Sequence, residues 1–203
     1  MDQADGLCVN DCTRCPDLVD SRSRIVNGVG PDDAELMFVG EGPGKTEDEQ
    51  GEPFVGRSGS VLDDALGEAG LLREEVRISN CVRCRPPENR DPTTDELANC
   101  RGYLDSEISA VDPTLVITLG KVPSQHLLDR SVAITKEAGD IVETRFGDRA
   151  QRLLLSVHPA ATLYDRSQRE TFFETIAEAV DIAGVGDGGD GNNGNGQSRL
   201  GEF

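Results

Sequence analysis

Four short apolar runs, each separated from the next by a longer segment, restrict the fold of this chain more than any other feature. The runs are Leu36–Gly40, Val76–Asn80, Leu115–Leu119 and Leu153–Val157. Apolar runs of this length are typical of strands that are buried on both faces of a parallel sheet. Helical patterning occupies four further segments, namely Ser58–Ala69, Thr93–Val111, Val122–Leu128 and Ser167–Ala183. The sequence therefore predicts an α/β fold, a three-layer α/β/α sandwich with a central four-stranded parallel sheet. The residues Ile141–Phe146 are expected to form an additional extended segment.

The carboxyl-terminal end of the chain differs in composition from the rest. From Gly184 it reads GVGDGGDGNNGNGQSRLGEF, which is too polar and glycine-rich to offset its ordering entropy by burial. We therefore expect residues 1–183 to form one domain and residues 184–203 to form a disordered tail. No apolar run approaches the roughly 20 residues that a membrane span needs, and the acidic start is unlike a secretory signal. We expect a cytoplasmic protein that does not act at a membrane.

The charge balance is strongly acidic, with a formal net charge of −18 and lysine only at Lys45, Lys121 and Lys136. Such a surplus suggests a protein that stays soluble in concentrated salt, where the Debye length falls to about 3 Å at 1 M. Strong salt also removes most of the counterion release that drives DNA binding. The negative charge therefore does not exclude a DNA substrate, but binding would depend on stacking, hydrogen bonds and local arginine contacts.

Polar residues follow three of the predicted strands at the point where each strand ends. These residues are Gly40, Glu41 and Gly42 after the first strand, Asn80 at the end of the second, and His158 after the fourth. Open parallel sheets bind ligands at the carboxyl ends of their strands. We therefore expect the three strand ends to form one shared site.

The glycine-rich loop after the first strand has a superficial similarity to a phosphate-binding loop. That loop needs the pattern G-x-x-x-x-G-K-[ST], whereas Gly40 stands one residue late relative to the GKT tripeptide at 44–46. The acidic residues and Pro53 that follow are expected to repel phosphate and to prevent a helix there, so nucleotide hydrolysis is not favoured. The glycines do allow a flat ligand to approach closely. Phe54, beyond them, is either a core residue or a stacking platform for a base.

Six cysteines lie at positions 8, 12, 15, 81, 84 and 100. Without signs of export, disulfides are not expected, and four thiolates without histidine suggest zinc or an iron–sulfur cluster. Three groupings are open from spacing. Positions 8, 12 and 15 imitate the motif of radical enzymes that use S-adenosylmethionine, but those need more strands than the four predicted. The pairs at 12–15 and 81–84 imitate a zinc ribbon. The third grouping takes positions 12, 15, 84 and 100 and leaves Cys8 and Cys81 spare, of which Cys81 can equally be a small core residue.

Taken in order, these motifs resemble the family-four, iron–sulfur uracil-DNA glycosylases of thermophilic bacteria and archaea. The matching stretches are CTRC at 12–15, GEGPGKTEDEQGEPFVGRSG at 40–59, SNCVRCRPPENR at 79–90, LVITLG at 115–120, ITK at 134–136 and HPA at 158–160. The resemblance runs from Cys12 to Ala183. It implies a uracil-DNA glycosylase-like fold and a 4Fe–4S cluster with the ligands Cys12, Cys15, Cys84 and Cys100.

The same resemblance implies how a uracil base extruded from DNA is recognised. Phe54 would lie against the face of the base, and the Asn80 amide would read its O4 and N3 edge, which cytosine does not match. Glu47 would crowd the C5 methyl of thymine. The remaining base atoms would contact the backbone of Gly40, Glu41 and Gly42.

For the chemistry, the resemblance implies a neutral His158 that stabilises the negative charge developing on uracil O2. Related glycosylases often hold a water-activating Asp where this chain has Gly42, so Glu41 is the remaining candidate for positioning water. These motifs hold no lysine suited to a Schiff base, so strand cleavage is not expected. The expected reaction is monofunctional hydrolysis of the N-glycosidic bond, which leaves an abasic site for base excision repair.

The expected partner is uracil-containing DNA, single- or double-stranded, bound by a monomeric protein; a sliding-clamp partner is not resolvable from the sequence. Phosphates are expected at Arg83, Arg85 and Arg90, and either Leu163 or Tyr164 is expected to enter the duplex as the base leaves. The alternative hypothesis is an iron–sulfur or zinc-stabilised DNA-binding or redox module without glycosylase activity.

Overall fold

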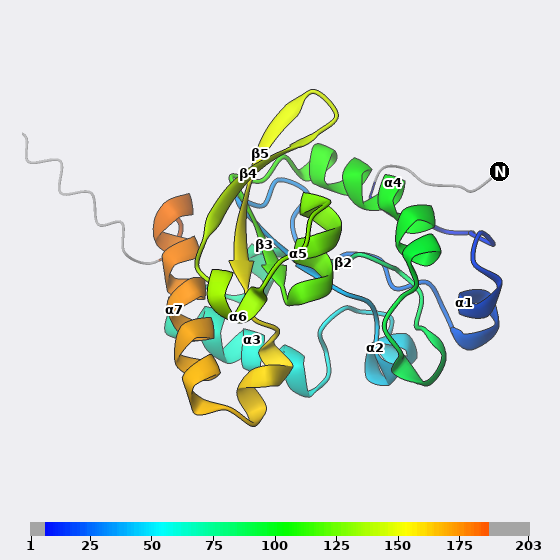
Figure 1. Ribbon diagram of the computed structural model, residues 1–203, viewed down its shortest axis with the longest axis horizontal. Coiled ribbons are helices and arrows are strands. Elements are labelled where there is room, and N and C mark those ends of the chain that lie inside the picture. Colours follow the sequence, from blue (N-terminus) through cyan, green and yellow to red (C-terminus); the bar gives the residue numbers. More distant parts are fainter. Residues whose placement is uncertain (1–6, 187–203) are drawn as a thin grey trace, which may run out of the picture.

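The computed structural model describes residues 7–186 and contains one five-stranded sheet (Figure 1). Its strands are β1 (Leu36–Gly40), β2 (Arg77–Asn80), β3 (Leu115–Leu119), β4 (Ile141–Phe146) and β5 (Arg149–Ser156). The order across the sheet is β2-β1-β3-β5-β4. All neighbours are parallel except β4, which pairs antiparallel with β5. The predicted four parallel strands are therefore confirmed, and the sheet gains a fifth strand.

The fifth strand arises from the additional extended segment of the sequence analysis. Phe146 pairs with Arg149, so only Gly147 and Asp148 connect the two strands. Gly147 has a φ of +59°, a left-handed conformation that glycine adopts without steric cost. Such a two-residue connection makes a hairpin, which forces β4 to run antiparallel to β5.

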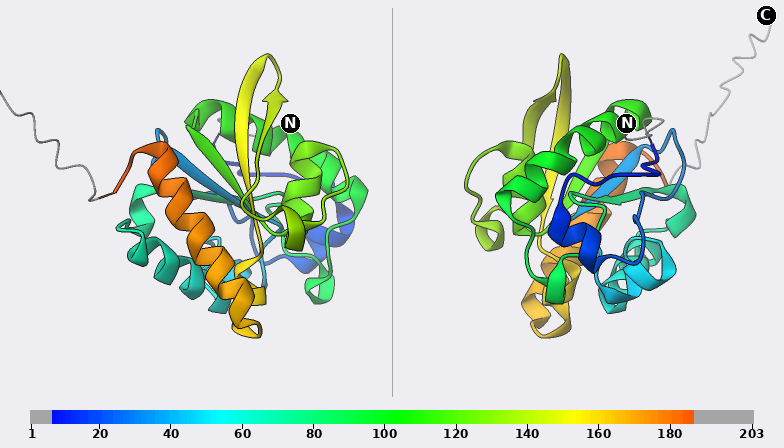
Figure 2. Two further views of the ribbon diagram at one scale, coloured as in Figure 1. Left: turned by 60° about the vertical axis from the view of Figure 1, so that its left-hand side comes forward. Right: turned by 90° about the vertical axis from the view of Figure 1, so that its right-hand side faces the viewer.

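Helices cover both faces of the sheet, which gives the predicted three layers (Figure 2). On one face, α3 (Arg57–Glu68) and α7 (Arg166–Ala183) share an apolar cluster with Leu36 and Phe38 of β1. On the other face, α4 (Thr94–Val111) and α5 (Lys121–Leu128) share a second cluster with Met37 and Val39. Because successive side chains of a strand point to opposite faces, the uninterrupted apolar run of β1 supplies both clusters.

The remaining elements are short. They are α1 (Pro16–Ser21), α2 (Lys45–Gln50), α6 (Ile134–Glu137) and the 3₁₀ helices η1 (Arg73–Glu75), η2 (Pro87–Asn89) and η3 (Pro159–Leu163). The expectation that no helix forms after the GKT tripeptide was wrong, because α2 runs from Lys45 to Gln50 and is capped by Gly51, whose φ is +89°. Glu47 and Asp48 lie in its first turn, where acidic side chains are favourable, and the Asp48 carboxylate accepts the backbone N–H of Ser23 at 2.8 Å.

The segment before β1 runs beside the outer edge of β2. Val29 and Ile78 exchange two backbone hydrogen bonds there, at 2.9 and 2.8 Å, as an isolated antiparallel bridge. At the other end of the chain, α7 ends at Ala183 and is capped by Gly184, whose φ is +65°. The expected disordered tail lies outside the described residues from residue 187 onwards.

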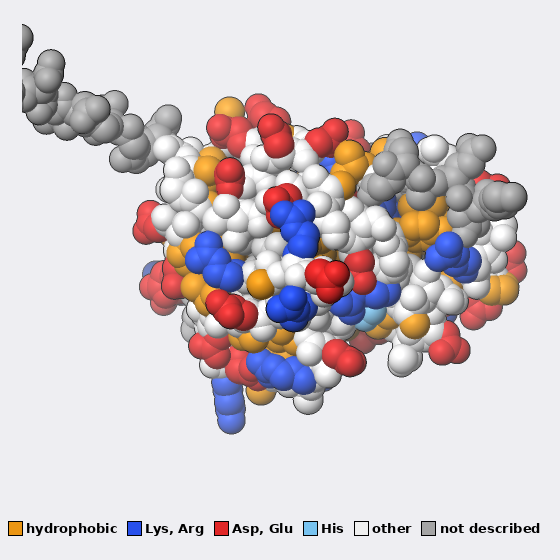
Figure 3. All heavy atoms as spheres, turned by 90° about the horizontal axis from the view of Figure 1, so that it is seen from above, with side chains coloured by type: hydrophobic (Ala, Val, Ile, Leu, Met, Phe, Trp, Pro, Cys, Tyr) orange, Lys and Arg blue, Asp and Glu red, His pale blue; other side chains and the backbone are white. Residues whose placement is uncertain are grey.

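On the face that carries the β4–β5 hairpin, acidic and basic side chains are interspersed (Figure 3). This face therefore presents no single sign of charge toward a polyanion. None of the helices between residues 7 and 186 is both long enough and apolar enough to cross a membrane.

Candidate active site

A pocket of about 170 Å³ lies where the parallel strands end. Its lining residues are Gly42, Gly44, Glu47, Phe54, Ser58, Asn80 and His158. Asn80 ends β2 and His158 follows β5, two strands with β1 and β3 between them in the sheet. The structure thus brings together residues more than 70 positions apart, as the strand-end argument predicts. Gly40 and Glu41 do not line this pocket.

Asn80 presents a free acceptor in the pocket. The residue is 4 % exposed, and its buried Oδ1 has no hydrogen-bond partner among residues 7–186. A Cβ placed on Gly40 would lie 2.5 Å from this oxygen and 2.5 Å from the Phe54 ring. Gly40 therefore contributes by its lack of a side chain, which lets the amide and the ring approach each other. Since buried polar atoms are normally paired, the unpaired Oδ1 points to a ligand that donates a hydrogen bond.

His158 is held as a neutral imidazole with a defined tautomer. Its Nδ1 accepts the backbone N–H of Ala160 at 3.1 Å, so the ring proton resides on Nε2. Burial lowers the pKa of His158 to about 4, and the nearby Glu47 only partly opposes this shift. At neutral pH, Nε2 is therefore an uncharged hydrogen-bond donor at the pocket.

Phe54 combines the two alternatives that its sequence position left open. It packs in the apolar cluster under α3 and α7, and it also lines the pocket. Its ring lies 6.0 Å from that of His158 at an interplanar angle of 34°. Its φ of +54° is left-handed, a conformation that costs a non-glycine residue roughly 1–2 kcal/mol. Such strain is found at sites where the backbone must aim a side chain.

Glu47 and Ser58 also line the pocket. The Glu47 carboxylate accepts the backbone N–H of Gly56 at 3.0 Å, which fixes α2 against the start of α3. Ser58 lies in the first turn of α3 and was not among the residues predicted for the site. A serine after Gly56 at the start of a predicted helix, just beyond Phe54, was the available signal for it.

Glu41 lies next to the pocket and has a perturbed acidity. Burial raises its pKa to about 7, with a further contribution from the carboxylate of Asp91. The neighbouring Gly42 has no room for a side chain, because a Cβ there would lie 2.7 Å from Val82. At Gly42 and Gly44, the chain therefore presents backbone rather than side chains to the pocket.

The cysteines at 12, 15, 84 and 100 lie near one another, although they come from three separate segments. Burial raises the pKa of Cys84, which the Arg22 hydrogen bond partly offsets, and the thiols of Cys12 and Cys15 raise it further. Cys100, on α4, likewise has its pKa raised to about 11 by burial, with contributions from Cys84 and Cys12. As placed, no three Cys, His, Asp or Glu side chains in the described part of the chain converge closely enough to hold a metal ion.

Two side chains donate to the sulfur atoms of this group. Arg22 donates to Cys84 Sγ at 2.9 Å and to the Cys12 carbonyl at 2.8 Å, and Asn99 donates to Cys15 Sγ at 3.5 Å. Cys81 is fully buried in the apolar cluster with α4, in agreement with its interpretation as a core residue.

One expectation about DNA contacts is wrong. Arg83 is only 3 % exposed and binds the buried carboxylate of Glu107 at 2.8 Å, so it cannot reach a phosphate. Arg90 is partly exposed and forms an ion pair with Glu96 at 2.7 Å. Arg85 donates to Asn89 at 2.7 Å. Sequence alone does not reveal this burial of Arg83, because its partner lies on a helix 24 residues away.

Comparison with known proteins agrees with this architecture. A family model described as the uracil DNA glycosylase superfamily matches residues 27–181. The type-4 uracil-DNA glycosylase of Archaeoglobus fulgidus is 38 % identical over 174 residues, covering 82 % of this chain and 87 % of the relative. That of Thermotoga maritima is 40 % identical over 174 residues, covering 84 % and 88 %. That of Sulfurisphaera tokodaii is 37 % identical over 177 residues, covering 85 % and 80 %. The chain therefore belongs to the type-4 uracil-DNA glycosylase family of the uracil-DNA glycosylase superfamily.

Proposed function

We propose that this chain is a monofunctional uracil-DNA glycosylase of base excision repair. It hydrolyses the N-glycosidic bond of uracil in DNA, releases free uracil and leaves an abasic site. The observation that carries this proposal is that one pocket holds both Asn80 Oδ1, which has no hydrogen-bond partner within residues 7–186, and a neutral His158 whose Nε2 carries the proton. The names of the relatives support the same substrate.

Recognition of the base follows from hydrogen-bond chemistry. Uracil presents a donor at N3 and an acceptor at O4, and a primary amide can satisfy both atoms together. Cytosine has an acceptor at N3 and a donor at C4, so it would oppose both contacts. Phe54 offers its ring to the face of the base, and base–aromatic stacking contributes about 1–3 kcal/mol. Glu47, across the pocket, would meet the C5 methyl of thymine.

Bond cleavage leaves positive charge on the sugar and negative charge on uracil O2. A hydrogen bond from His158 Nε2 to O2 strengthens as this charge develops, so it stabilises the transition state more than the bound substrate. Gly42 supplies no carboxylate to activate water, and Glu41 lies beside the pocket rather than in its wall. We therefore assign catalysis chiefly to stabilisation of the leaving group, with a loosely held water that attacks the sugar.

The base must leave the helical stack before it reaches this pocket. Leu163 and Tyr164 follow the His158 segment at the end of η3, and they are 36 % and 83 % exposed. Exposed side chains of this size can fill the space from which the base departs. We assign this role to one of these two residues.

The four thiols lie close enough to perturb one another's pKa and are the donor set that a 4Fe–4S cluster needs, although their side chains would have to draw together to bind it. Cys12, Cys15, Cys84 and Cys100 would hold it, and the N–H donors of Arg22 and Asn99 already contact two of the sulfurs, as is favourable for thiolate ligands. When bound, the cluster would cross-link the three segments rather than take part in hydrolysis. We further propose that the protein acts as a cytoplasmic monomer adapted to concentrated salt.

The test uses the purified holoprotein with a uracil-containing oligonucleotide in high salt, followed by alkali, which cleaves at abasic sites. Cleavage only after alkali, and only at uracil, is the expected result. Intact oligonucleotide would instead support the alternative, an iron–sulfur or zinc-stabilised DNA-binding or redox module.

A further inference from the structure

The position of the Asn80 amide in the pocket depends on the backbone of β2, which carries the side chain. Its Oδ1 has no hydrogen-bond partner among the described residues, so no neighbouring side chain fixes the orientation of that oxygen. Asn80 also ends β2, which lies at one edge of the sheet and pairs with only one other strand, β1. The contacts that hold β2 therefore decide where the amide lies.

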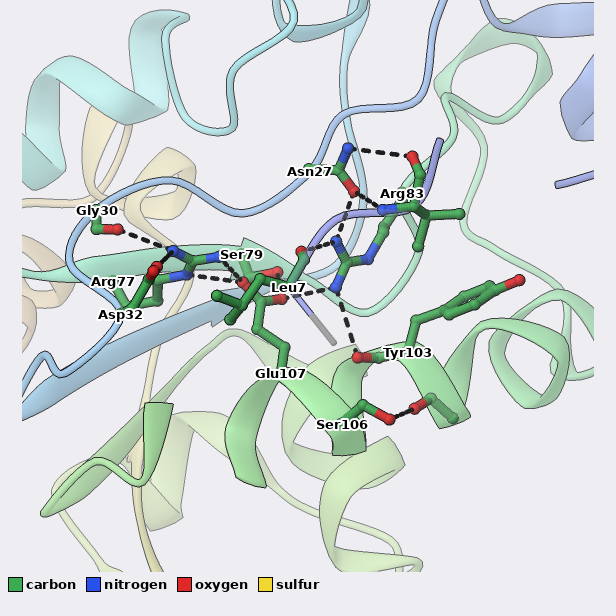
Figure 4. Close-up of polar contacts among 12 residues, drawn as sticks. Leu7, Asn27, Gly30, Asp32, Arg77, Ser79, Arg83, Tyr103, Ser106 and Glu107 are labelled. Carbon is green, nitrogen blue, oxygen red and sulfur yellow. Dashed lines mark hydrogen bonds and ion pairs between the residues drawn. The ribbon is translucent and has the colours of Figure 1, made fainter. Parts of the chain in front are cut away.

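The buried carboxylate of Glu107 binds side chains of β2 on the face of the strand opposite Asn80. Glu107, on α4, is 0 % exposed, and Ser79 Oγ donates to its Oε2 at 2.7 Å. The guanidinium of Arg77 binds Glu107 Oε1 at 2.8 Å, and that of Arg83 binds Oε2 at 2.8 Å. Figure 4 shows these side chains converging on Glu107. Alternate residues of a strand share a face, so Arg77 and Ser79 lie on the face turned away from Asn80.

The same network reaches the segment along the outer edge of β2. Arg83 donates to the Leu7 carbonyl at 3.0 Å and to Asn27 Oδ1 at 2.7 Å, and Arg77 donates to the Gly30 carbonyl at 2.8 Å (Figure 4). The backbone carbonyl of Arg83 also accepts the N–H of Val26 at 2.8 Å. Residues 77–83 are therefore fixed on three sides: by β1, by this segment and by α4.

Glu107 is the carboxylate that both buried arginines share. Arg77 and Arg83 bring two positive charges into an almost solvent-free region, where Glu107 supplies one negative charge, and Asp32, whose side chain is 72 % exposed, pairs with Arg77 from the surface at 3.1 Å. A buried charge without its partner is strongly unfavourable. Both arginines therefore depend on Glu107 as their buried partner, and Ser79, which donates to the same carboxylate, directly precedes Asn80.

We propose that Glu107 is a positioning residue for base recognition and that it acts on Asn80 through Ser79. This inference rests on the proposed function, in which Asn80 reads the uracil edge. Glu107 touches neither the pocket nor the base; it holds the end of β2 so that the free Oδ1 faces the ligand.

The first test compares Ser79→Ala with Thr175→Val in the holoprotein, by single-turnover excision of uracil from an oligonucleotide. Thr175 is also buried, and its hydroxyl donates to the Thr171 carbonyl at 2.7 Å within α7. Both variants lose one buried hydroxyl, but only Ser79→Ala releases the end of β2. We expect Ser79→Ala to lower the excision rate about tenfold, the size expected for losing one positioning hydrogen bond, and Thr175→Val to leave it within about twofold of wild type.

The second test separates positioning from general destabilisation with Asn80→Ala and the double variant Ser79→Ala/Asn80→Ala. If Ser79 acts through Asn80, its removal costs nothing further once the amide is gone, so the double variant should match Asn80→Ala. Losses that multiply, or a Ser79→Ala rate equal to that of Thr175→Val, would overturn the inference. Absence of uracil excision by the wild type would instead refute the proposed function.

A third variant, Glu107→Gln, removes the charge and leaves two arginines with too few partners. If it folds, excision should fall by more than in Ser79→Ala while its far-ultraviolet circular dichroism stays that of wild type. A folded Glu107→Gln protein that excises uracil at the wild-type rate would contradict the proposal. If Glu107→Gln does not fold, the comparison of Ser79→Ala, Asn80→Ala and their double variant decides whether the inference holds.

Discussion

The backbone N–H of Ala160 donates to Nδ1 of His158 at 3.1 Å, and this bond fixes which nitrogen of the imidazole keeps its proton. A protonated ring could not accept this bond, because both of its nitrogens would then be donors. The bond and the burial of the ring therefore favour the same neutral state. That state leaves Nε2 as the donor toward the pocket.

The first prediction concerns the pH dependence of stability. The pKa of His158 is lowered from 6.5 to about 4 in the folded protein, so the unfolded chain binds the proton more readily. The stabilisation that this residue contributes is present above pH 6.5 and is lost as the pH falls toward 4. Between pH 7 and pH 5 the free energy of unfolding should lose about 2 kcal/mol from this group. Urea unfolding at both pH values, for wild type and His158→Gln, measures it, and an equal pH dependence in the two proteins would contradict it.

The second prediction concerns base recognition. Asn80→Ala should lower uracil excision roughly 10²–10³-fold, because the amide supplies paired contacts in a water-poor pocket. Its iron content and thermal unfolding should stay close to those of wild type, since Oδ1 makes no internal hydrogen bond within the described residues. Single-turnover kinetics with an oligonucleotide measure the rate. Excision at the wild-type rate would remove Asn80 from the recognition scheme.

The third prediction concerns discrimination against thymine. Glu47→Ala should open the pocket wall and raise excision of thymine from a G·T mismatch by at least about tenfold over wild type. Glu47→Gln preserves the size of the side chain and is the matched control, which should still exclude thymine. If neither variant excises thymine, the methyl group is rejected by some other contact.

The fourth prediction concerns the carboxyl group beside the pocket. The pKa of Glu41 is raised to about 7 by burial and by Asp91, so its protonated form is favoured in the folded protein. Stability contributed by this group is present at low pH and is lost as the pH rises through 7. Glu41→Gln should therefore gain stability relative to wild type between pH 5 and pH 8, by about 1 kcal/mol, since this half-buried group is partly screened by solvent. Chemical denaturation at the two pH values tests this, and a constant difference would disprove it.

The fifth prediction separates the cysteines. Cys100→Ala should lose most of the bound iron and the broad absorbance near about 400 nm that is typical of iron–sulfur proteins. Cys81→Ala is the matched control, because it also removes one thiol, but one that is buried in the apolar core; this variant should retain the iron and the absorbance. Iron analysis of the two proteins, purified without oxygen, decides the matter. Equal iron in both would exclude Cys100 as a ligand.

Much of this architecture could be predicted from the sequence, because it depends on local patterns. β1 and β3 are almost entirely apolar, and their predicted limits agree with the structure at both ends, whereas the limits of β2 and β5, which include polar residues, differ by one to four residues. The strand ends could be placed in one region because parallel strands end at the same edge of a sheet. The same argument predicts that Asn80 and His158 lie together, and both line the pocket.

Other features depend on partners distant in the chain and could not be predicted in this way. The arginine-rich loop predicts that Arg83 binds phosphate, yet Arg83 is buried in an ion pair with Glu107. The acidic stretch after Lys45 predicts no helix, yet α2 forms there. Its carboxylates have partners distant in sequence, because Asp48 accepts the backbone N–H of Ser23 and Glu47 accepts that of Gly56. Long-range hydrogen bonds of this kind leave no periodic pattern in the sequence.

The bridge between Val29 and Ile78 also bears on how the protein avoids aggregation. An open strand at the rim of a sheet invites pairing with another molecule, and mutual repulsion is a weak safeguard once concentrated salt screens it. At one edge, β2 is bridged to the preceding segment of the same chain by the Val29–Ile78 hydrogen bonds. The other is β4, where exposed Glu143 and Arg145 make intermolecular pairing costly. The two edges of the sheet are thus protected from intermolecular pairing in different ways, one by a backbone bridge and the other by charged side chains.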